Sequence, residues 1–230
     1  MDLMCVSLTG ADDGTSVEDL ARLSKKHPLL EWAILSSTER AGTARYPTDE
    51  WVAQFHRACP LARKAIHLCG KDVDRFMEQD PRIVAKVARF DRVQLNFNHR
   101  RKPIDVAQLI AVAKKTAPTI ILQYNSANAP LWELLHGKIV NLAFLFDSSG
   151  GNGRRPDFWP DMLPQTVCGF SGGLGPDNLA AEMPRILEKA GTCRFWVDME
   201  SSLRHKETDA FDLDTADAAL EQVLPIRKAA

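Results

Sequence analysis

The sequence predicts an α/β protein folded as a (β/α)8 TIM barrel, with a single domain over residues 1–230. Three observations lead to this prediction. Short apolar runs of strand length recur at fairly even spacing, and segments with helical signals separate them. The unit of one apolar run and the segment after it repeats eight times. Most runs place Val, Ile, Leu or Phe on successive positions, as parallel strands covered on both faces do. The length is close to the ~250 residues typical of this fold.

The eight predicted strands are these apolar runs. Polar or small side chains follow most of them, which marks where each strand passes into a loop. The predicted strands cover residues 3–9, 30–36, 64–69, 92–96, 119–124, 140–147, 166–171 and 194–199.

Helical signals fill most of the intervals between the strands. Ser16 and Thr48 are N-cap residues followed by acidic groups in the first turn, which predicts a helix after each. Helical periodicity predicts further helices over residues 104–115, 179–190 and 214–224, and Gly191 is a C-cap candidate for the second of these.

The connection over residues 148–164 has the weakest helical signal. It contains three glycines and three prolines, so it is expected to be a long loop with at most a short helix around residues 157–159. A doubly wound open sheet is the competing architecture, but eight repeats without a G-x-G-x-x-G after the first strand favour the closed barrel.

Composition excludes several classes of function. A formal net charge of -1 gives no basic footprint for nucleic acid or an anionic membrane, and no apolar stretch approaches the ~20 residues that span a bilayer. The five cysteines are scattered, without zinc-ligand spacing, and the N-terminus lacks a signal-peptide pattern. We therefore expect a cytoplasmic protein with reduced thiols and neither a metal nor a cofactor.

Polar residues gather at the predicted carboxyl ends of the strands, where barrel enzymes place their active sites. Asn96, Asp147, Asp198 and Glu200 all occupy such positions. This arrangement predicts a mouth that binds a polar small molecule.

Two adjacent glycines, Gly172 and Gly173, follow the seventh predicted strand and precede a helix. Bare backbone N–H groups near a positive helix end bind oxyanions, and the last two βα loops of barrels frequently hold phosphate. Ser201 and Ser202 follow the eighth strand and add hydroxyl groups beside them. These four residues are the predicted phosphate site, although Gly-Gly also occurs as a simple turn.

Several segments resemble phosphoribosylanthranilate isomerases, in the same order along nearly the whole chain. "FSGGLGPDNLAAEM" is similar to that family's A-G-G-L-x-P-x-N-V segment, and "FLFDSSGGNGRRPDFW" to its L-L-D followed by G-G-T-G-x-x-F-D-W. "WVDMESSLRHKETDAFD" resembles V-D-x-S-S-G-V-E, "VQLNF" resembles V-Q-L-H-G, and "TARYP" resembles S-P-R-Y.

The resemblance implies a metal-free Amadori rearrangement, in which an aminoaldose 5-phosphate opens and becomes a 1-amino-ketose. It implies a role in tryptophan biosynthesis if the substrate is phosphoribosylanthranilate. The family's general acid falls on Asp147, and the arginine that could meet the anthranilate end of the substrate falls on Arg45. The expected partner is thus a small phosphorylated sugar or aromatic amine-sugar; the sequence leaves a homodimer open.

The family's general base is the cysteine of K-I-C-G-I-T, and here the chain reads "MCVSLTG". Cys5 is the nearest equivalent, but aligning the threonines places Val6 at the base position. A one-residue slip turns a strand side chain to the other face unless a bulge restores it. Cys69, at the end of the third predicted strand, is the other thiol near the expected mouth.

Other departures lie at the predicted mouth. Asn96 replaces the histidine of Q-L-H-G, Glu200 is introduced, and Ser202 replaces the glycine of S-S-G. Asn96 and Glu200 are predicted to contact substrate. Two alternatives therefore stand beside the isomerase: a divergent barrel acting on another phosphosugar, and a non-catalytic protein that binds a phosphorylated ligand.

Overall fold

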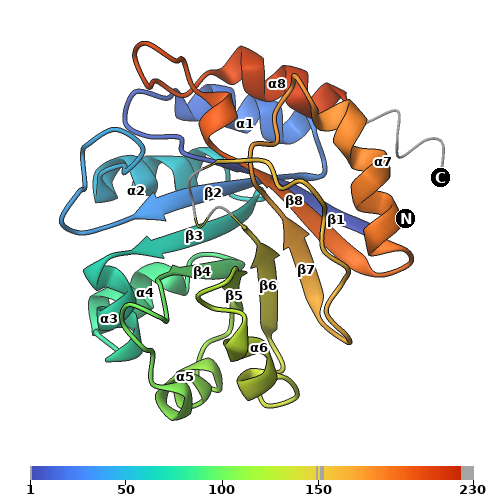
Figure 1. Ribbon diagram of the computed structural model, residues 1–230. Helices are drawn as coiled ribbons and strands as arrows, with labels where there is room; N and C mark the ends of the chain where they lie inside the picture. The colour runs from blue at the N-terminus through green and yellow to red at the C-terminus, as the bar shows by residue number, and fades with distance from the viewer. Residues whose placement is uncertain (1, 149, 151–152, 224–230) are drawn as a thin grey trace.

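Eight parallel strands close into a barrel in the order β1 to β8, with β8 paired to β1 (Figure 1). The computed structural model describes residues 2–148, 150 and 153–223. The predicted fold class is confirmed. The strands are β1 (Asp2–Thr9), β2 (Leu30–Ser36), β3 (Arg63–Cys69), β4 (Arg92–Asn96), β5 (Thr119–Tyr124), β6 (Leu142–Phe146), β7 (Val167–Phe170) and β8 (Arg194–Met199).

Helices surround the strands (Figure 1). Two of them begin at the predicted caps, because the side chains of Ser16 and Thr48 accept the backbone N–H groups of Asp19 and Trp51. The helices are α1 (Val17–Lys26), α2 (Asp49–Ala58), α3 (Lys71–Met77), α4 (Pro81–Val87), α5 (Val106–Ala113), α6 (Pro130–Leu135), α7 (Leu179–Ala190), the 3₁₀ helix η1 (Ser201–Leu203) and α8 (Leu213–Glu221). None of the helices in the described part of the chain is long and apolar enough to cross a bilayer.

Two connections depart from a simple repeat of one helix after each strand. The chain after β3 forms both α3 and α4, because Gln79 at φ 60° ends the first and Asp80-Pro81 caps and opens the second. After β6, residues 153–166 contain no helix, as their glycines and prolines predict. Helix α5 is shorter than the predicted 104–115 because Asp105 is its N-cap.

The two faces of the barrel strands have different surroundings. Outward-facing residues such as Val6, Leu8 and Phe170 join one large apolar core beneath the helices. The interior holds a small apolar cluster of Cys5, Ile121, Ala143, Leu145 and Trp196, with polar groups above and beside it. The strand alternation therefore separates a structural face from a face that carries charge.

One close contact in the interior requires a glycine. A Cβ built on Gly169 in β7 would lie 2.1 Å from Cε2 of Trp196 in β8. Trp196 is 1% exposed and packs within the barrel, so its ring has no free space to move into. The pair fixes how closely β7 and β8 approach.

We predict that Gly169→Ala destabilises the protein by about 1–3 kcal/mol, because overpacking forces the ring or the strand to shift. Urea unfolding measures this loss. The same substitution in a Trp196→Leu background removes the clashing ring and is expected to cost clearly less, as a double-mutant cycle shows. Equal costs in the two backgrounds would contradict this account of the contact.

Candidate functional site

A polar cavity of ≈ 50 Å³ opens at the carboxyl ends of β6, β7 and β8. Its volume exceeds the ~10–15 Å³ that one water needs, so it has room for several waters or one tetrahedral oxyanion. We call it the mouth cavity. It is lined by Asp147, Gly153, residues 171–174 and residues 198–202. It therefore contains Asp147, Glu200 and all four predicted phosphate-binding residues.

The glycine pair is required by a close approach of backbone. Gly172 has φ 118° and Gly173 has φ 63°, in the region that favours glycine. A Cβ on Gly172 would lie 2.8 Å from the carbonyl oxygen of Arg154, and a Cβ on Gly173 would lie 2.8 Å from that of Gly153. The connection after β6 thus folds directly over the glycines, which closes one wall of the mouth cavity.

The same geometry leaves backbone donors at the cavity. Among the described residues, the N–H groups of Gly172, Gly173, Ser201 and Ser202 have no hydrogen-bond acceptor. Buried or half-buried backbone donors normally have partners, in protein or in a ligand. Two loops that present such groups to one cavity form an arrangement suited to an oxyanion.

Ser202 contributes less than the sequence suggests. Its hydroxyl donates to the carbonyl oxygen of Leu174, so its one O–H is already used. A Cβ on Gly175 would lie 2.5 Å from the Cβ of Ser202, so the serine side chain packs where only a glycine leaves room. Ser202 can offer a ligand its backbone N–H but not its hydroxyl proton.

Asp147 follows β6 directly and is buried. Gln123 of β5 donates its Nε2–H to Oδ2 of Asp147 at 2.8 Å, which fixes the carboxyl group at the mouth cavity. A held carboxyl group beside backbone donors can exchange a proton with a bound ligand.

Asp198 of β8 is a second carboxyl group in the mouth cavity, and it is buried. Thr9 donates its hydroxyl to Oδ1 of Asp198 at 2.9 Å. Burial raises the pKa of Asp198 well above its ordinary value, and the nearby charge of Glu200 raises it further. Asp198 therefore holds its proton at a pH where ordinary carboxyl groups have lost theirs, and can serve as a proton donor.

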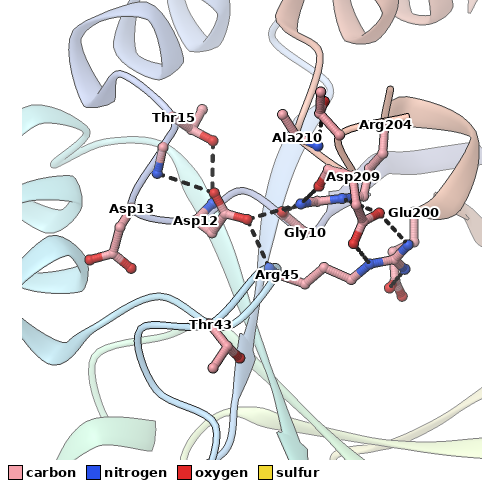
Figure 2. A network of polar contacts seen from close by, with 12 residues as sticks. Gly10, Asp12, Asp13, Thr15, Thr43, Arg45, Glu200, Arg204, Asp209 and Ala210 are labelled. Atoms are coloured by element: carbon pink, nitrogen blue, oxygen red, sulfur yellow. Dashed lines mark hydrogen bonds and ion pairs between the residues drawn. The ribbon is translucent and has the colours of Figure 1, made fainter. Parts of the chain in front are cut away.

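Arg45 lies at the rim of the mouth, where acidic groups hold it on several sides (Figure 2). Its guanidinium group forms a two-point pair with Asp209, with 3.1 Å from Nε to Oδ2 and 2.7 Å from Nη2 to Oδ1, and reaches Oε1 of Glu200 at 2.8 Å. These contacts raise the pKa of Arg45, and the hydrogen bond to Asp209 contributes most. The Arg45 side chain is thus already paired where the sequence predicts a substrate contact.

The wider network around Arg45 joins three loops (Figure 2). Oδ2 of Asp12 accepts the backbone N–H of Arg45 at 2.8 Å and Nη2 of Arg204 at 2.9 Å. Arg204 also pairs with Asp209 and donates to the carbonyl oxygen of Gly10. The loops after β1, β2 and β8 are therefore linked by ion pairs beside the mouth cavity.

Asn96 and Cys69 lie together at the ends of β4 and β3, outside the lining of the mouth cavity. Asn96 Nδ2 donates to Cys69 Sγ at 3.3 Å, and Gln94 donates to Asn96 Oδ1 at 2.8 Å. Burial raises the pKa of the Cys69 thiol. The structure does not bring either residue to the cavity that Asp147 lines.

Cys5 has the wrong position and protonation state for a base acting with Asp147. A register shift between Leu3 and Cys5 does act as the bulge that turns Cys5 into the barrel interior. However, Cys5 lies near the amino-terminal end of β1, where it lines a different cavity. Burial raises the pKa of its thiol to about 12, and the charge of Glu31 raises it further, so the thiolate is strongly disfavoured.

A second cavity, of ≈ 390 Å³, adjoins the mouth cavity at Ser171, which lines both. Its walls are mainly aromatic and proline side chains, among them Tyr124, Phe146, Phe158 and Trp159. The sequence alone does not predict this cavity. The sequence signal for this cavity is the aromatic pair Phe158-Trp159 between Pro156 and Pro160. In the structure, the side chain of Phe158 is 83% exposed. An exposed ring beside an apolar cavity is suited to an apolar part of a ligand.

Among the described residues, one group has the spacing of metal ligands. The ligand atoms of His27, Asp217 and Glu221 lie within 4.8 Å of one another. Lys26 Nζ pairs with both carboxylates, at 2.8 Å from Asp217 and 2.7 Å from Glu221. Because the ammonium group of Lys26 already pairs with both acids, the group is explained as an ion-pair cluster between α1 and α8.

The chain is thus a (β/α)8 barrel with a carboxylate-lined cavity where β6, β7 and β8 end. No protein-family model matches the sequence, and no curated protein matches it.

Solved structures do match. The chain is similar to phosphoribosylanthranilate isomerase from Thermotoga maritima, with a TM-score of 0.63 at 15% identity over 96% of this chain and 99% of that one. It is also similar to N-(5'-phosphoribosyl)anthranilate isomerase from Pyrococcus furiosus, with a TM-score of 0.56 at 11% identity over 96% and 99%. A truncated 3-deoxy-D-arabino-heptulosonate 7-phosphate synthase from Thermotoga maritima matches with a TM-score of 0.60 at 10% identity over 99% and 87%. These likenesses show the fold.

The raised pKa of Asp198 has a consequence for stability. The folded protein holds this proton more tightly than the unfolded chain, so stability falls as pH rises from the ordinary value of 3.8 through the folded pKa. The loss is up to about 1.4 kcal/mol per pH unit in that window. We predict that Asp198→Asn, which stays neutral and keeps the acceptor for Thr9, loses less melting temperature than wild type between about pH 5 and pH 8. Parallel curves of melting temperature against pH in the two proteins would contradict this prediction. The control Asp161→Asn, a change at an exposed acid, should show the same pH dependence as wild type.

The Arg45 network also makes a stability prediction. Arg45→Gln leaves Glu200 without its cation and leaves Asp209 paired with Arg204 alone. We therefore expect a loss of about 1–2 kcal/mol in urea unfolding, between the values for exposed and buried charge pairs. Arg22→Gln removes a single exposed pair with Asp19 and is expected to cost less than about 0.5 kcal/mol. Equal losses in the two variants would show that the network does not hold the three loops.

Proposed function

We propose that this barrel binds a small phosphorylated sugar at its mouth and isomerises it. Two carboxyl groups of the protein exchange protons with the sugar. The observation that carries the proposal is a set of backbone N–H groups from two loops that have no acceptor among the described residues and lie in one cavity with Asp147 and Asp198. Oriented amides stabilise a dianionic group without a cationic side chain. The proposed phosphate ligands are the N–H groups of Gly172, Gly173, Ser201 and Ser202.

The chemistry that fits is an Amadori-type aldose–ketose isomerisation of an aminosugar phosphate. An acid first protonates the ring oxygen as the bond from this oxygen to C1 breaks, which leaves an open-chain protonated imine. A base then removes the proton from C2 of this cation, which gives a neutral enolamine. The base returns that proton to C1 while the C2 hydroxyl gives its proton to the acid group, so the 1-amino-ketose forms and both carboxyl groups regain their starting states. Such paired acid–base steps need two groups with different proton affinities, within reach of one sugar.

Asp198 is the acid and Asp147 the base in the proposed mechanism. Asp198 holds a proton because it is buried, so it protonates the ring oxygen. Asp147 is held by the amide of Gln123 and takes the proton from C2. This assignment departs from the role implied by the sequence resemblance, where Asp147 is the acid and Cys5 the base. It follows from the distance between Cys5 and the mouth along β1 and from its raised pKa.

The aromatic cavity beside Ser171 extends the proposed site. A substrate with its phosphate at residues 172–173 would pass Asp147 and place an apolar group against Tyr124 and Trp159. Phosphoribosylanthranilate combines a ribose 5-phosphate with an aromatic ring, and that substrate would place the protein in tryptophan biosynthesis. The solved structures similar to this chain include enzymes named for this compound and for another sugar phosphate, which supports the choice of substrate class.

Turnover of freshly made phosphoribosylanthranilate, followed by the loss of its fluorescence, tests the proposal. We predict measurable turnover by wild type and a loss of 10²–10⁴-fold, the usual contribution of a general acid or base, in Asp147→Asn and in Asp198→Asn. Asp161→Asn, at an exposed acid on the loop after β6, should retain wild-type activity.

Thermal stabilisation by ribose 5-phosphate separates binding from catalysis. Stabilisation without turnover would contradict the isomerase and favour a barrel that only binds a phosphorylated ligand. That alternative has one observation in its favour, the absence of a thiol among the described residues that line the mouth cavity. The absence of both turnover and stabilisation would contradict the phosphate site itself.

A further inference from the structure

We propose that the opposite, amino-terminal end of the barrel holds a second anion site, for a small molecule with two or more phosphate or carboxylate groups. A cavity of ≈ 600 Å³ opens there. Arg63, Arg92 and Arg194 line it, and each is the first residue of its strand, β3, β4 and β8 respectively. Because all strands are parallel, this end is the one opposite Asp147. We call it the basal cavity.

The basal cavity concentrates positive charge in a chain whose net charge is -1. Five of its lining residues are basic, Arg63, Lys64, Arg89, Arg92 and Arg194, and two are acidic, which leaves a formal excess of three positive charges. A concave surface lined by charges of one sign focuses the field and attracts counter-ions.

The two acids of the basal cavity already have partners. Glu31 is 2% exposed, accepts the hydroxyl of Ser7 at 2.7 Å and forms a two-point pair with Arg92. Asp91 accepts the backbone N–H of Lys64 at 2.8 Å. Neither carboxylate therefore forms an ion pair with Arg63, Arg89 or Arg194, the exposed arginines at the rim of the cavity.

The arginines at the rim of the basal cavity have no acidic partner among the described residues. Within the part of the chain that the structure describes, Arg63, Arg89 and Arg194 make no ion pair, and all three are exposed. Arg63 donates one N–H to the carbonyl oxygen of Met4, which holds it over the opening. Guanidinium groups bind phosphate and carboxylate in two-point geometry, so three of them around one cavity suit an oxyanion.

The floor of the basal cavity is positively charged as well. Arg92 is 5% exposed, its guanidinium carbon lies 4.4 Å from the ring centre of Trp196, and its Nη1 has no hydrogen-bond partner. Glu31 is the only acid paired with it among the described residues. A buried cation with an unsatisfied nitrogen gains from further negative charge nearby, so an anion in the cavity would stabilise Arg92 electrostatically.

Size and shape restrict the ligand to a small molecule. Small-molecule sites typically have volumes of ~300–1,000 Å³ and are concave, as this cavity is. Nucleic acids and membranes instead need an extended basic surface, and the balanced charge of the chain offers no such footprint. More than one oxyanion group is needed because the unpaired cations lie on β3, β8 and the segment before β4.

Calorimetric titration of the full chain with citrate and with pyrophosphate tests this site. We expect saturable binding that weakens at least about tenfold in the double variant Arg63→Gln, Arg194→Gln, because charge-assisted hydrogen bonds are lost. Both arginines are exposed, so folding should be unaffected. Arg82→Gln, a matched change on α4 at a side chain that is 85% exposed, should bind as wild type does.

A gain-of-binding variant provides an independent test. Asp91→Asn keeps an oxygen for the backbone N–H of Lys64 but removes one negative charge from the basal cavity, so it should bind citrate several-fold more tightly. The double variant should still be stabilised by ribose 5-phosphate, because the mouth cavity is at the other end of the barrel. This readout distinguishes failure of the basal site from failure of the proposed function.

Unchanged citrate and pyrophosphate affinity in the double variant would overturn the proposal. So would an equal loss in Arg82→Gln, which would indicate unspecific attraction to surface charge. Binding of a single-stranded oligonucleotide that depends on Arg63 and Arg194, with neither small anion bound, would overturn it in favour of a nucleic-acid surface.

Discussion

The mouth of this barrel depends on a close approach of backbone segments that only glycine permits. Gly172 and Gly173 lie against the carbonyl oxygens of Arg154 and Gly153, and Gly175 lies against the side chain of Ser202. These contacts bring the connection after β6 and the loop after β8 onto the loop after β7. The glycine N–H groups, which have no acceptor among the described residues, consequently face a cavity rather than solvent.

The barrel interior carries polar groups that are costly to bury, and their pairing explains where they lie. Near the amino-terminal end, Arg92 is compensated by Glu31 and contacts the ring of Trp196. Near the mouth, Thr9 holds Asp198 and Gln123 holds Asp147. The apolar cluster around Trp196 separates the two ends, so one set of strands presents a cationic cavity at one end and an acidic one at the other.

Much of the fold could be predicted because eight apolar runs and the caps at Ser16 and Thr48 are local signals. The sequence also identified Asp147, Glu200 and the Gly-Gly pair as neighbours, since the carboxyl ends of barrel strands meet at one rim. The face of β1 on which Cys5 lies could not be predicted, because it depends on a bulge at Met4. Nor could the pairing of Arg45 with Asp209, since 164 residues separate the two partners. Helices α3 and α4 depend on a left-handed residue at Gln79, a position that propensity does not favour for glutamine.

In the proposed site, the amides of two loops hold an anion beside Asp147. A ¹H–¹⁵N titration of the protein with ribose 5-phosphate reports each of these backbone N–H groups separately. We expect saturable downfield shifts of the amide protons of Gly172, Gly173 and Ser201, all with one dissociation constant. Saturable binding that leaves these three amides unshifted would contradict it.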